Sequence, residues 1–184
     1  MRLCVTILFL LFLSCTHAQN FIKVDALVIN YPNRFSKTTD LSQLINRDFK
    51  TDSNKVRAIY TWMINNIGYS YEDTLIYDKM YANYNDDHIK PVANFALKRG
   101  TTICAGYACL FKQLCSEVNV ECYYVSGYAR NYFDSLLTDN EPMHAWNIVV
   151  LDNKKHFVDA TWGASTYDNV GKFKRDPTYF YFLT

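Results

Sequence analysis

The sequence lacks an excess of charge of either sign. Lysine and arginine together number 19, and aspartate and glutamate number 18, so the formal net charge is +1 at pH 7. The sequence also lacks a run of consecutive basic residues. Proteins that bind nucleic acids concentrate basic charge on one face or along one helix. We therefore expect no nucleic-acid partner.

The chain also lacks internal repeats and low-complexity linkers. Its hydrophobic content is 49% and its charged content is 20%, which is typical of a folded globular chain rather than a disordered one. A length of 184 residues is enough for one domain with a substantial core. The sequence contains no apolar run of the about 20 residues that a membrane-spanning helix needs, so we expect no membrane span.

The N-terminus resembles a secretory signal. Arg2 precedes an apolar run over residues 3–13, and small residues follow at Thr16 and Ala18. This order predicts cleavage after Ala18 and a secreted or periplasmic protein. Cys15 leaves a lipid-anchored N-terminus as a minor alternative. We divide the chain into a signal peptide (1–18), an N-terminal arm and helix (19–52) and a main domain (53–184).

The cysteines lack the paired spacing of a structural zinc site. Outside the signal region they are separated by 5, 6 and 7 residues, at Cys104, Cys109, Cys115 and Cys122. Zinc ligands usually come in closely spaced pairs, so we expect no metal and no cofactor. An exported protein can form disulfides, and Cys115 with Cys122 is the most plausible pair. Buried cysteines are more often small hydrophobic residues without a disulfide, and we favour free thiols over this pair.

The stretch from Gly100 to Val118 predicts a loop followed by a helix that begins at Cys104. Apolar residues recur at helical intervals from Ala108 onward. The unpaired amides and the positive end of the dipole at a helix N-terminus favour an anion, which raises the thiolate fraction of a cysteine there. Cys104 is therefore a candidate nucleophile.

A candidate base lies downstream in a predicted hairpin. Two β-rich runs, 145–151 and 156–162, flank Asp152-Asn153, a pair that suits a two-residue turn. This loop makes Leu151 face Lys154 and His144 face Thr161. His144 and Asp159 then become diagonal neighbours, roughly 7 to 8 Å apart at the backbone. A loop shifted by one residue would separate them too far to touch, so the spacing permits a Cys-His-Asp triad without proving one.

The remaining elements follow from local patterns. Tyr69 to Tyr71 favours an extended segment, and the span 72–90 favours a long irregular segment. The other predicted elements are a strand or loose arm at 21–29, a helix from Asp40, a helix capped by Asp52 or Ser53 and stopped by Gly68, a helix over Val92 to Lys98 opened by Pro91, a strand over Cys122 to Ala129, a polar connection over Arg130 to Pro142 and a strand within 179–183.

Three motifs together resemble the core of the transglutaminase-like superfamily, and most closely its branch named for the kyphoscoliosis peptidase. They are Arg99-Gly-Thr-Thr-Ile-Cys104-Ala-Gly-Tyr107-Ala, His144-Ala-Trp146-Asn147 and Val158-Asp159-Ala-Thr-Trp162-Gly163. The segment Val56 to Tyr71 resembles the helix and strand that precede the cysteine in that branch.

The resemblance implies an α+β, papain-like core, in which a central helix with the cysteine at its N-terminus packs on an antiparallel sheet. It implies a catalytic triad at Cys104, His144 and Asp159. The aromatic residues of the motifs, Tyr107, Trp146 and Trp162, are candidate substrate-binding residues. The chain ends on a predicted aromatic strand, and a domain that is incomplete at its C-terminus would explain this ending.

We expect an exported cysteine hydrolase or acyltransferase that acts on peptide or amide bonds of a protein or peptide substrate through a thioester. Transfer of the acyl group to a lysine amine, which cross-links proteins, is one alternative. A protein-binding domain that keeps the fold without catalysis is another, and a zinc site built from Cys104, His144 and Asp159 is the remaining one. The sequence leaves the oligomeric state and the second oxyanion donor open.

Overall fold

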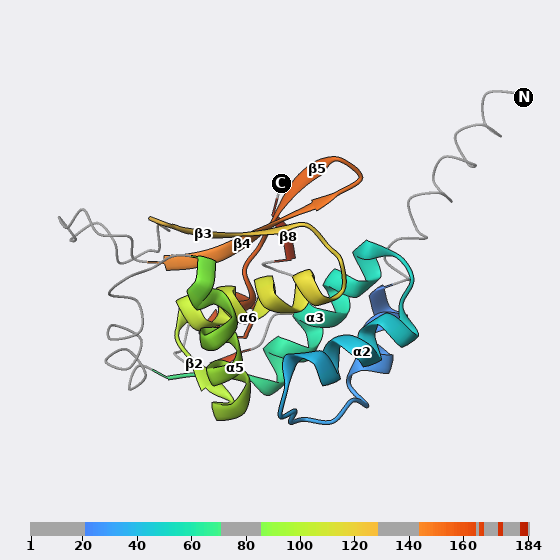
Figure 1. Cartoon of the computed structure of the whole chain (residues 1–184), viewed down its shortest axis with the longest axis horizontal. Coiled ribbons are helices and arrows are strands. Elements are labelled where there is room, and N and C mark those ends of the chain that lie inside the picture. Colours follow the sequence, from blue (N-terminus) through green and yellow to red (C-terminus); the bar gives the residue numbers. More distant parts are fainter. Residues whose placement is uncertain are drawn as a thin grey trace, which may run out of the picture.

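A central helix, α6 (Cys104–Glu117), lies beneath a four-stranded antiparallel sheet (Figure 1). The computed structural model describes residues 21–70, 86–128, 144–164, 166–167, 173–174 and 181–183. Three predicted segments lie outside these residues: the signal peptide (1–18), residues 72–85 of the irregular segment 72–90, and the polar connection (130–142). The mixture of helices with an antiparallel sheet confirms the predicted α+β class.

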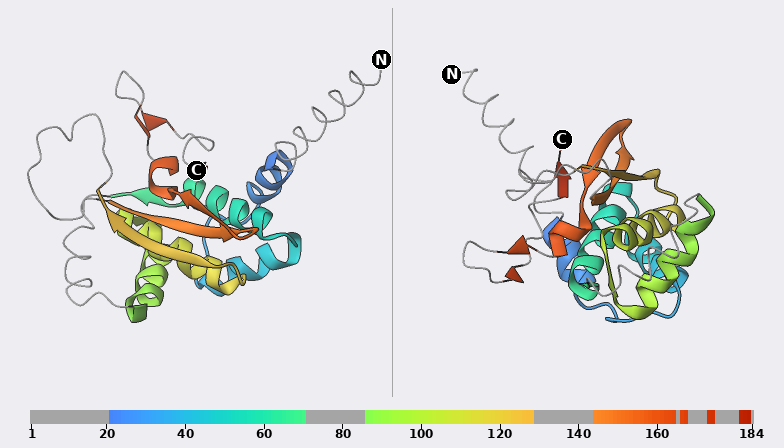
Figure 2. Two further views of the ribbon diagram at one scale, coloured as in Figure 1. Left: turned by 90° about the horizontal axis from the view of Figure 1, so that it is seen from above. Right: turned by 90° about the vertical axis from the view of Figure 1, so that its left-hand side faces the viewer.

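The sheet has the order β3-β4-β5-β8, with each neighbouring pair antiparallel. Its strands are β3 (Cys122–Gly127), β4 (His144–Leu151), β5 (Lys154–Val158) and β8 (Tyr181–Leu183). Alternate residues of β4 from Ala145 to Leu151 are buried, and α6 packs against β4 and β3. Seen from above, the strands run across α6 (Figure 2). The sheet is therefore apolar on the face that covers the central helix.

The predicted turn between β4 and β5 is correct. Asp152 and Asn153 have φ of 50° and 59°, which is the left-handed backbone of a type I′ hairpin, and Leu151 pairs with Lys154 as expected. The pairing stops at Asn147 and Val158. The second run was predicted to remain extended to Trp162, and this was wrong, because the chain turns into a short helix, α7 (Ala160–Ala164).

Helix α3 (Asp52–Asn66) is surrounded by other elements. Every residue from Val56 to Ile64 is buried, because α6, α7 and the N-terminal segment pack on different sides of the helix. The Thr51 hydroxyl caps it by accepting from the Asn54 amide at 3.4 Å, so the cap falls one residue before the predicted one.

Residues 21–28 are helical, so the predicted strand or loose arm at 21–29 is wrong. The helix is attached to α3 by a partly buried ion pair, in which the Asp25 carboxylate accepts from Arg57 Nε at 2.8 Å and from Nη2 at 2.6 Å. Thr61 Oγ1 donates to the same carboxylate at 2.6 Å. These contacts are tertiary, which explains why the local pattern did not indicate a helix.

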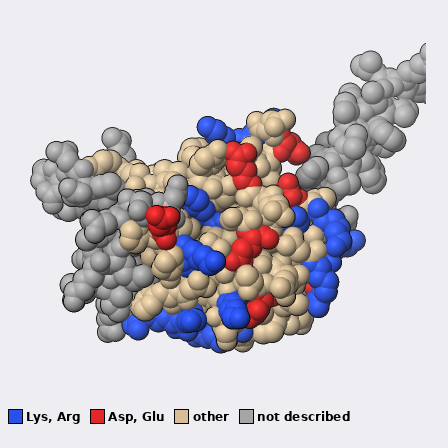
Figure 3. All heavy atoms as spheres, viewed as in Figure 1, with Lys and Arg blue, Asp and Glu red and all other residues tan. Residues whose placement is uncertain are grey.

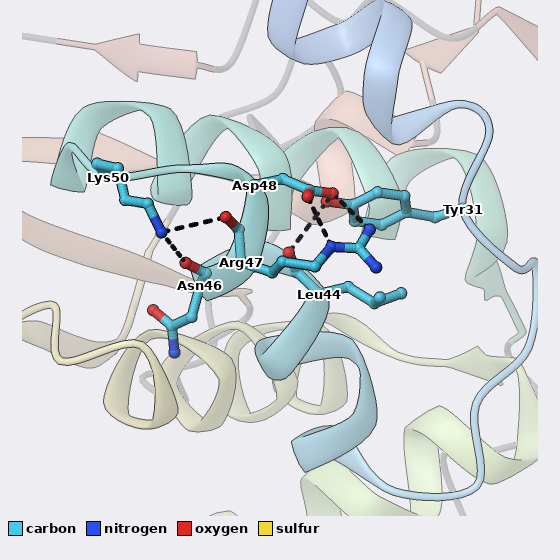
Figure 4. Close-up of polar contacts among 6 residues, drawn as sticks. All are labelled: Tyr31, Leu44, Asn46, Arg47, Asp48 and Lys50. Carbon is cyan, nitrogen blue, oxygen red and sulfur yellow. Dashed lines mark hydrogen bonds and ion pairs between the residues drawn. The ribbon is translucent and has the colours of Figure 1, made fainter.

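Helix α2 (Thr38–Asp48) begins two residues before the predicted Asp40 start and packs on α6. A polar network closes its C-terminal end (Figure 4): Tyr31 donates to Asp48 Oδ2 at 2.7 Å, and Lys50 Nζ donates to the Asn46 and Arg47 carbonyls. Burial and the Asp48 hydrogen bond raise the pKa of Tyr31. The network therefore holds the chain that enters α2 against the end of that helix.

The segment before the central helix consists of a short 3-10 turn, η2 (Asp86–His88), and α5 (Ile89–Arg99). Pro91 lies in the first turn of α5, where a proline is tolerated, so the helix begins before the predicted Val92. Gly100, with φ of 72°, ends α5 in the left-handed conformation. Strand β2 (Thr101–Thr102) follows and pairs in parallel with β1 (Gly68–Tyr69).

The remaining short strands, β6 (Thr166–Tyr167) and β7 (Phe173–Lys174), form an antiparallel pair. The four cysteines Cys104, Cys109, Cys115 and Cys122 are free thiols in the structure, which is the favoured interpretation of the sequence. Burial and a hydrogen bond with Cys122 raise the pKa of the Cys115 thiol well above its ordinary value. Cys115 is thus a protonated part of the core.

Candidate active site

Cys104 is the first residue of α6, as predicted. Ile103 precedes it with extended backbone angles and forms the N-cap of the helix. The parallel pairing of β1 and β2 fixes the two residues immediately before Ile103. The Cys104 side chain is partly exposed, whereas Tyr107 and Ala108 in the next turn are buried. The thiol therefore sits at the boundary between the core and the surface, beside amides that have no partner within the helix.

His144 is the first residue of β4, and only 9% of it is exposed. Its Nε2 lies 2.6 Å from Oδ2 of Asp159, and the Cys104 side chain is close enough to the imidazole to help raise the pKa of His144. Because Nε2 is engaged by the carboxylate, Nδ1 is the ring nitrogen left for the thiol. The structure thus brings the three predicted triad residues together, with the imidazole between the thiol and the carboxylate.

Asp159 is held in position by α7, the short helix that the sequence analysis did not predict. It lies between β5 and α7, and its Oδ1 accepts the Trp162 amide hydrogen at 2.9 Å. This is the geometry of a helix N-cap, in which a side-chain oxygen satisfies an unpaired amide of the first turn. One oxygen therefore caps α7 and the other binds His144, which fixes the orientation of the carboxylate and explains why the strand ends at Val158.

The groups around His144 favour the charged form of its imidazole. Burial on its own lowers the pKa of His144, but the hydrogen bonds to Asp159 and Cys104 outweigh it and raise the pKa from 6.5 to about 9. A protonated imidazole beside a thiol is the arrangement that stabilises a thiolate. The site therefore favours an imidazolium beside the Cys104 side chain at neutral pH.

Two of the three predicted substrate-binding aromatics lie beside this histidine. The Trp162 ring stacks with the His144 ring at 4.7 Å and 16°, and the Trp146 ring does so at 5.9 Å and 26°. Both tryptophans are partly exposed. An indole face also attracts a cation. Their observed contact is with the imidazole, which they position and support when it is charged.

Tyr107 is buried in the core. Its side chain is 1% exposed, and its hydroxyl donates to the Ile67 carbonyl at 2.5 Å. The contact joins α6 to the C-terminal end of α3 and helps to position the central helix. The predicted substrate-binding role of Tyr107 stays a prediction.

Asn147 is a residue of the site region to which the sequence analysis gave no role. It is 1% exposed, and its Nδ2 donates to the Ala108 carbonyl at 3.0 Å and to the Tyr123 carbonyl at 3.2 Å. One amide thus joins α6, β3 and β4 near the start of the helix. A polar residue at an inward position of an otherwise apolar strand was the signal that pointed to such a role.

No group of three or more histidine, cysteine or acidic residues suited to hold a metal occurs within the part of the chain that the structure describes. Among the same residues, no helix is both long and apolar enough to cross a membrane. The arrangement of Cys104, His144 and Asp159 is chemically compatible with a nucleophile, a base and an orienting carboxylate.

These features define an α+β protein in which a cysteine at a helix N-terminus contacts a histidine on an antiparallel sheet. A family model described as transglutaminase-like superfamily matches residues 39–161, and the chain belongs to this superfamily. The chain is 31% identical over 172 residues to the kyphoscoliosis peptidase of Homo sapiens, and the match covers 90% of this chain and 24% of that protein. The predicted resemblance is therefore confirmed.

Two further comparisons found similar proteins. Lim and transglutaminase domain protein ltd-1 of Caenorhabditis elegans is 29% identical over 159 residues, which covers 81% of this chain and 20% of that protein. A crystal structure of a TGase aligns with a TM-score of 0.46 and 23% identity over 86% of this chain and 36% of the other. The chain spans about a quarter or less of the length of the human and Caenorhabditis elegans relatives.

Proposed function

We propose that this chain is the catalytic domain of an exported cysteine hydrolase that cleaves peptide or amide bonds through a thioester intermediate. The observation that carries the proposal is the position of His144, which is hydrogen-bonded to Asp159 at 2.6 Å and lies beside Cys104 at the N-terminus of α6. The superfamily membership and the name of the human relative, a peptidase, support the same class of chemistry.

In the proposed reaction the Cys104 thiolate attacks the carbonyl carbon of the substrate and forms a C–S bond. The backbone amide of Cys104, which starts α6, donates to the oxyanion of the tetrahedral intermediate. The His144 imidazolium then gives its proton to the leaving amine as the C–N bond breaks, which leaves a thioester and a neutral imidazole.

Hydrolysis of the thioester uses the same groups in the reverse sense. Neutral His144 accepts a proton from water, whose oxygen attacks the thioester carbon, and the C–S bond breaks to release a carboxylic acid and the Cys104 thiolate beside the imidazolium. Asp159 keeps Nε2 as the donor of the hydrogen bond between them, so Nδ1 faces the reacting atoms throughout. Trp162 lies against the ring and limits its rotation.

Export is part of this proposal. Residues 1–18 carry the charged start, apolar run and small residues of a secretory signal. N-terminal sequencing of protein recovered outside the cytosol should begin at Gln19. Recovery of an intact Met1 outside the cytosol, or a lipid on Cys15, would replace the proposed cleavage with another mode of export.

The test is a panel of peptide and protein substrates, incubated with and without a fluorescent primary amine. We expect new carboxyl ends to form faster than amide bonds to the added amine, and we expect Cys104→Ala to abolish both products. A protein that incorporates the amine faster than it hydrolyses the substrate would be a cross-linking transglutaminase. A wild type no more active than Cys104→Ala would indicate a binding domain without catalysis.

A further inference from the structure

The outer face of the four-stranded sheet, on the side away from α6, is apolar. Alternate residues of β4, such as Val149, point inward to the core, where α6 packs against the sheet. The residues between them point outward, because side chains alternate along a strand. In the left view of Figure 2 the strands lie in front of α6, so this view shows the outer face. Its apolar residues, all at least partly exposed, are Tyr123, Val125, Trp146, Ile148, Val150 and Phe157.

The centre of the outer face is a row of three apolar side chains, one from each of three neighbouring strands. Tyr123 pairs with Ile148, and Ile148 pairs with Phe157. Tyr123 is 48% exposed and Phe157 is 42% exposed. Residues directly opposite each other on antiparallel strands lie about 5 Å apart, so the row is contiguous. Aromatic side chains with a polar surround are typical of the centre of a protein–protein interface.

The next row on the outer face is charged at both ends. Its centre is Val150, whose amide donates to the Glu121 carbonyl at 3.0 Å and which pairs with Lys155 on its other side. Both charged residues are exposed, and the Tyr123 hydroxyl donates to the Glu121 carboxylate, which places that carboxylate on the outer face. Figure 3 shows side chains of both signs along the upper edge of the molecule, where the sheet lies. This row is therefore negative at its β3 end and positive at its β5 end.

A twofold axis parallel to the strands makes both rows complementary to themselves. Such an axis sets the β3 side of one copy against the β5 side of the other. Tyr123 of each copy then faces Phe157 of the other, and Ile148 faces its own counterpart at the axis. In the charged row, Glu121 of each copy faces Lys155 of the other. Sheets that pack face to face lie about 10 Å apart with their strands within about 30° of each other, a gap that these side chains can fill.

We propose that a second copy of this chain packs on the outer face and forms a twofold-symmetric dimer. A symmetric interface requires a surface that is complementary to itself, and a second copy supplies the charged row in the reverse order that Glu121 and Lys155 need. Burial of the apolar row supplies the affinity, and the two ion pairs fix the orientation. The formal net charge of +1 is too small for two copies to repel each other strongly. The inference is independent of the proposed function, because it uses neither Cys104 nor a substrate.

Sedimentation equilibrium of the exported protein at a series of concentrations tests the proposal. A reducing agent is present throughout, so that disulfide-linked dimers do not contribute. The first variant is Ile148→Lys, which brings two like charges together at the axis. Its matched control is Ile22→Lys, because Ile22 is 67% exposed and lies on the N-terminal helix. We expect Ile148→Lys to weaken the dimer at least tenfold and the control to remain within about twofold of the parent. Thermal unfolding verifies that each variant folds.

Charge reversal tests the orientation of the two copies and does not depend on whether Ile148→Lys folds. Glu121→Lys brings two lysines together at each ion pair, and Lys155→Glu brings two carboxylates together, so either change alone should weaken the dimer about tenfold. An equimolar mixture of the two single variants restores opposite charges at both pairs, because each copy supplies the sign that the other lacks. We therefore expect the mixture to dimerise more tightly than either variant alone. The double variant Glu121→Lys and Lys155→Glu should dimerise with itself for the same reason.

Three results would overturn the proposal. The first is a protein that stays monomeric up to about 100 μM, which would also be the result if a different protein or another polypeptide segment covers the outer face. The second is a dimer that Ile148→Lys and Ile22→Lys weaken equally, and the third is a mixture of the single charge variants that associates no more tightly than its components. None of these measurements involves turnover. A dimer that hydrolyses nothing would refute only the proposed function, and an active monomer would refute only the dimer.

Discussion

Replacement of Asp159 by asparagine should lower the pKa of His144 toward 6.5. In the wild type, burial lowers this pKa, but hydrogen bonds to Asp159 and Cys104 bring it from 6.5 to about 9. This difference corresponds to about 3 kcal/mol in favour of the imidazolium. Asparagine keeps the size of the side chain and removes its charge, so most of this preference should disappear. At pH 8 an imidazole with a pKa of 6.5 is protonated about thirtyfold less often than one with a pKa of about 9.

The direct assay is an NMR titration of protein with ¹⁵N-labelled histidines, in which a His144→Gln variant identifies the resonance. The wild-type His144 should titrate near pH 9 and the Asp159→Asn variant closer to 6.5. Substrate hydrolysis should follow, because the imidazolium protonates the leaving amine, so the alkaline limb of the pH profile should move to lower pH in the variant. A wild-type His144 that titrates near 6.5 would refute the reasoning.

The raised pKa of His144 also makes the stability of the fold depend on pH. Since the pKa of His144 is higher in the folded protein than in the unfolded chain, the contribution of its charge is fully present below pH 6.5 and is lost as the pH rises through about 9. The stability lost on Asp159→Asn should therefore contain a part of about 3 kcal/mol that is present at pH 6 and absent at pH 10. Urea unfolding of both proteins at the two pH values measures it.

Three further predictions concern the packing around the site. Gly163→Ala should lower activity in a hydrolysis assay, because the new Cβ would lie 2.1 Å from the Tyr60 hydroxyl and would displace α7, the helix that Asp159 caps. Gly68→Ala is the control, since its new Cβ would have its nearest contact at 3.4 Å. Asn147→Leu should destabilise the fold by about 2 kcal/mol, measured by urea unfolding, because the Ala108 and Tyr123 carbonyls would lose a donor. Limited alkylation, followed by peptide mass mapping, should modify Cys104 first and leave Cys115, whose buried thiol has a raised pKa, unmodified. Unchanged activity of Gly163→Ala would contradict the first prediction, and unchanged stability of Asn147→Leu would contradict the second. Labelling of Cys115 before Cys104 would contradict the third.

Local signals explain the parts of the fold that the sequence predicts well. Gly100 adopts the left-handed conformation that ends α5, and α6 begins at Cys104, because both are decided within a few residues. The Asp152-Asn153 turn fixes the β4–β5 register for the same reason. These two results place the helix N-terminus and the hairpin, which is why the neighbourhood of Cys104 and His144 could be inferred before the structure.

The incorrect predictions share a cause, which is that tertiary contacts decide the local structure there. The helix at 21–28 depends on Asp25 binding Arg57, more than 30 residues away in the sequence. Helix α7 is too short for a periodic pattern and is capped by an aspartate that also binds His144.

The central claim is that His144 activates Cys104 as a nucleophile. The most direct measurement is the rate at which iodoacetamide alkylates Cys104 at pH 6, followed by intact-protein mass spectrometry in the wild type and in His144→Gln. A free cysteine, with a pKa of about 8.5, is almost entirely protonated at this pH. The account predicts that wild-type Cys104 reacts several-fold faster than free cysteine and that His144→Gln abolishes the advantage. A wild-type rate equal to that of free cysteine, unchanged in His144→Gln, would contradict it.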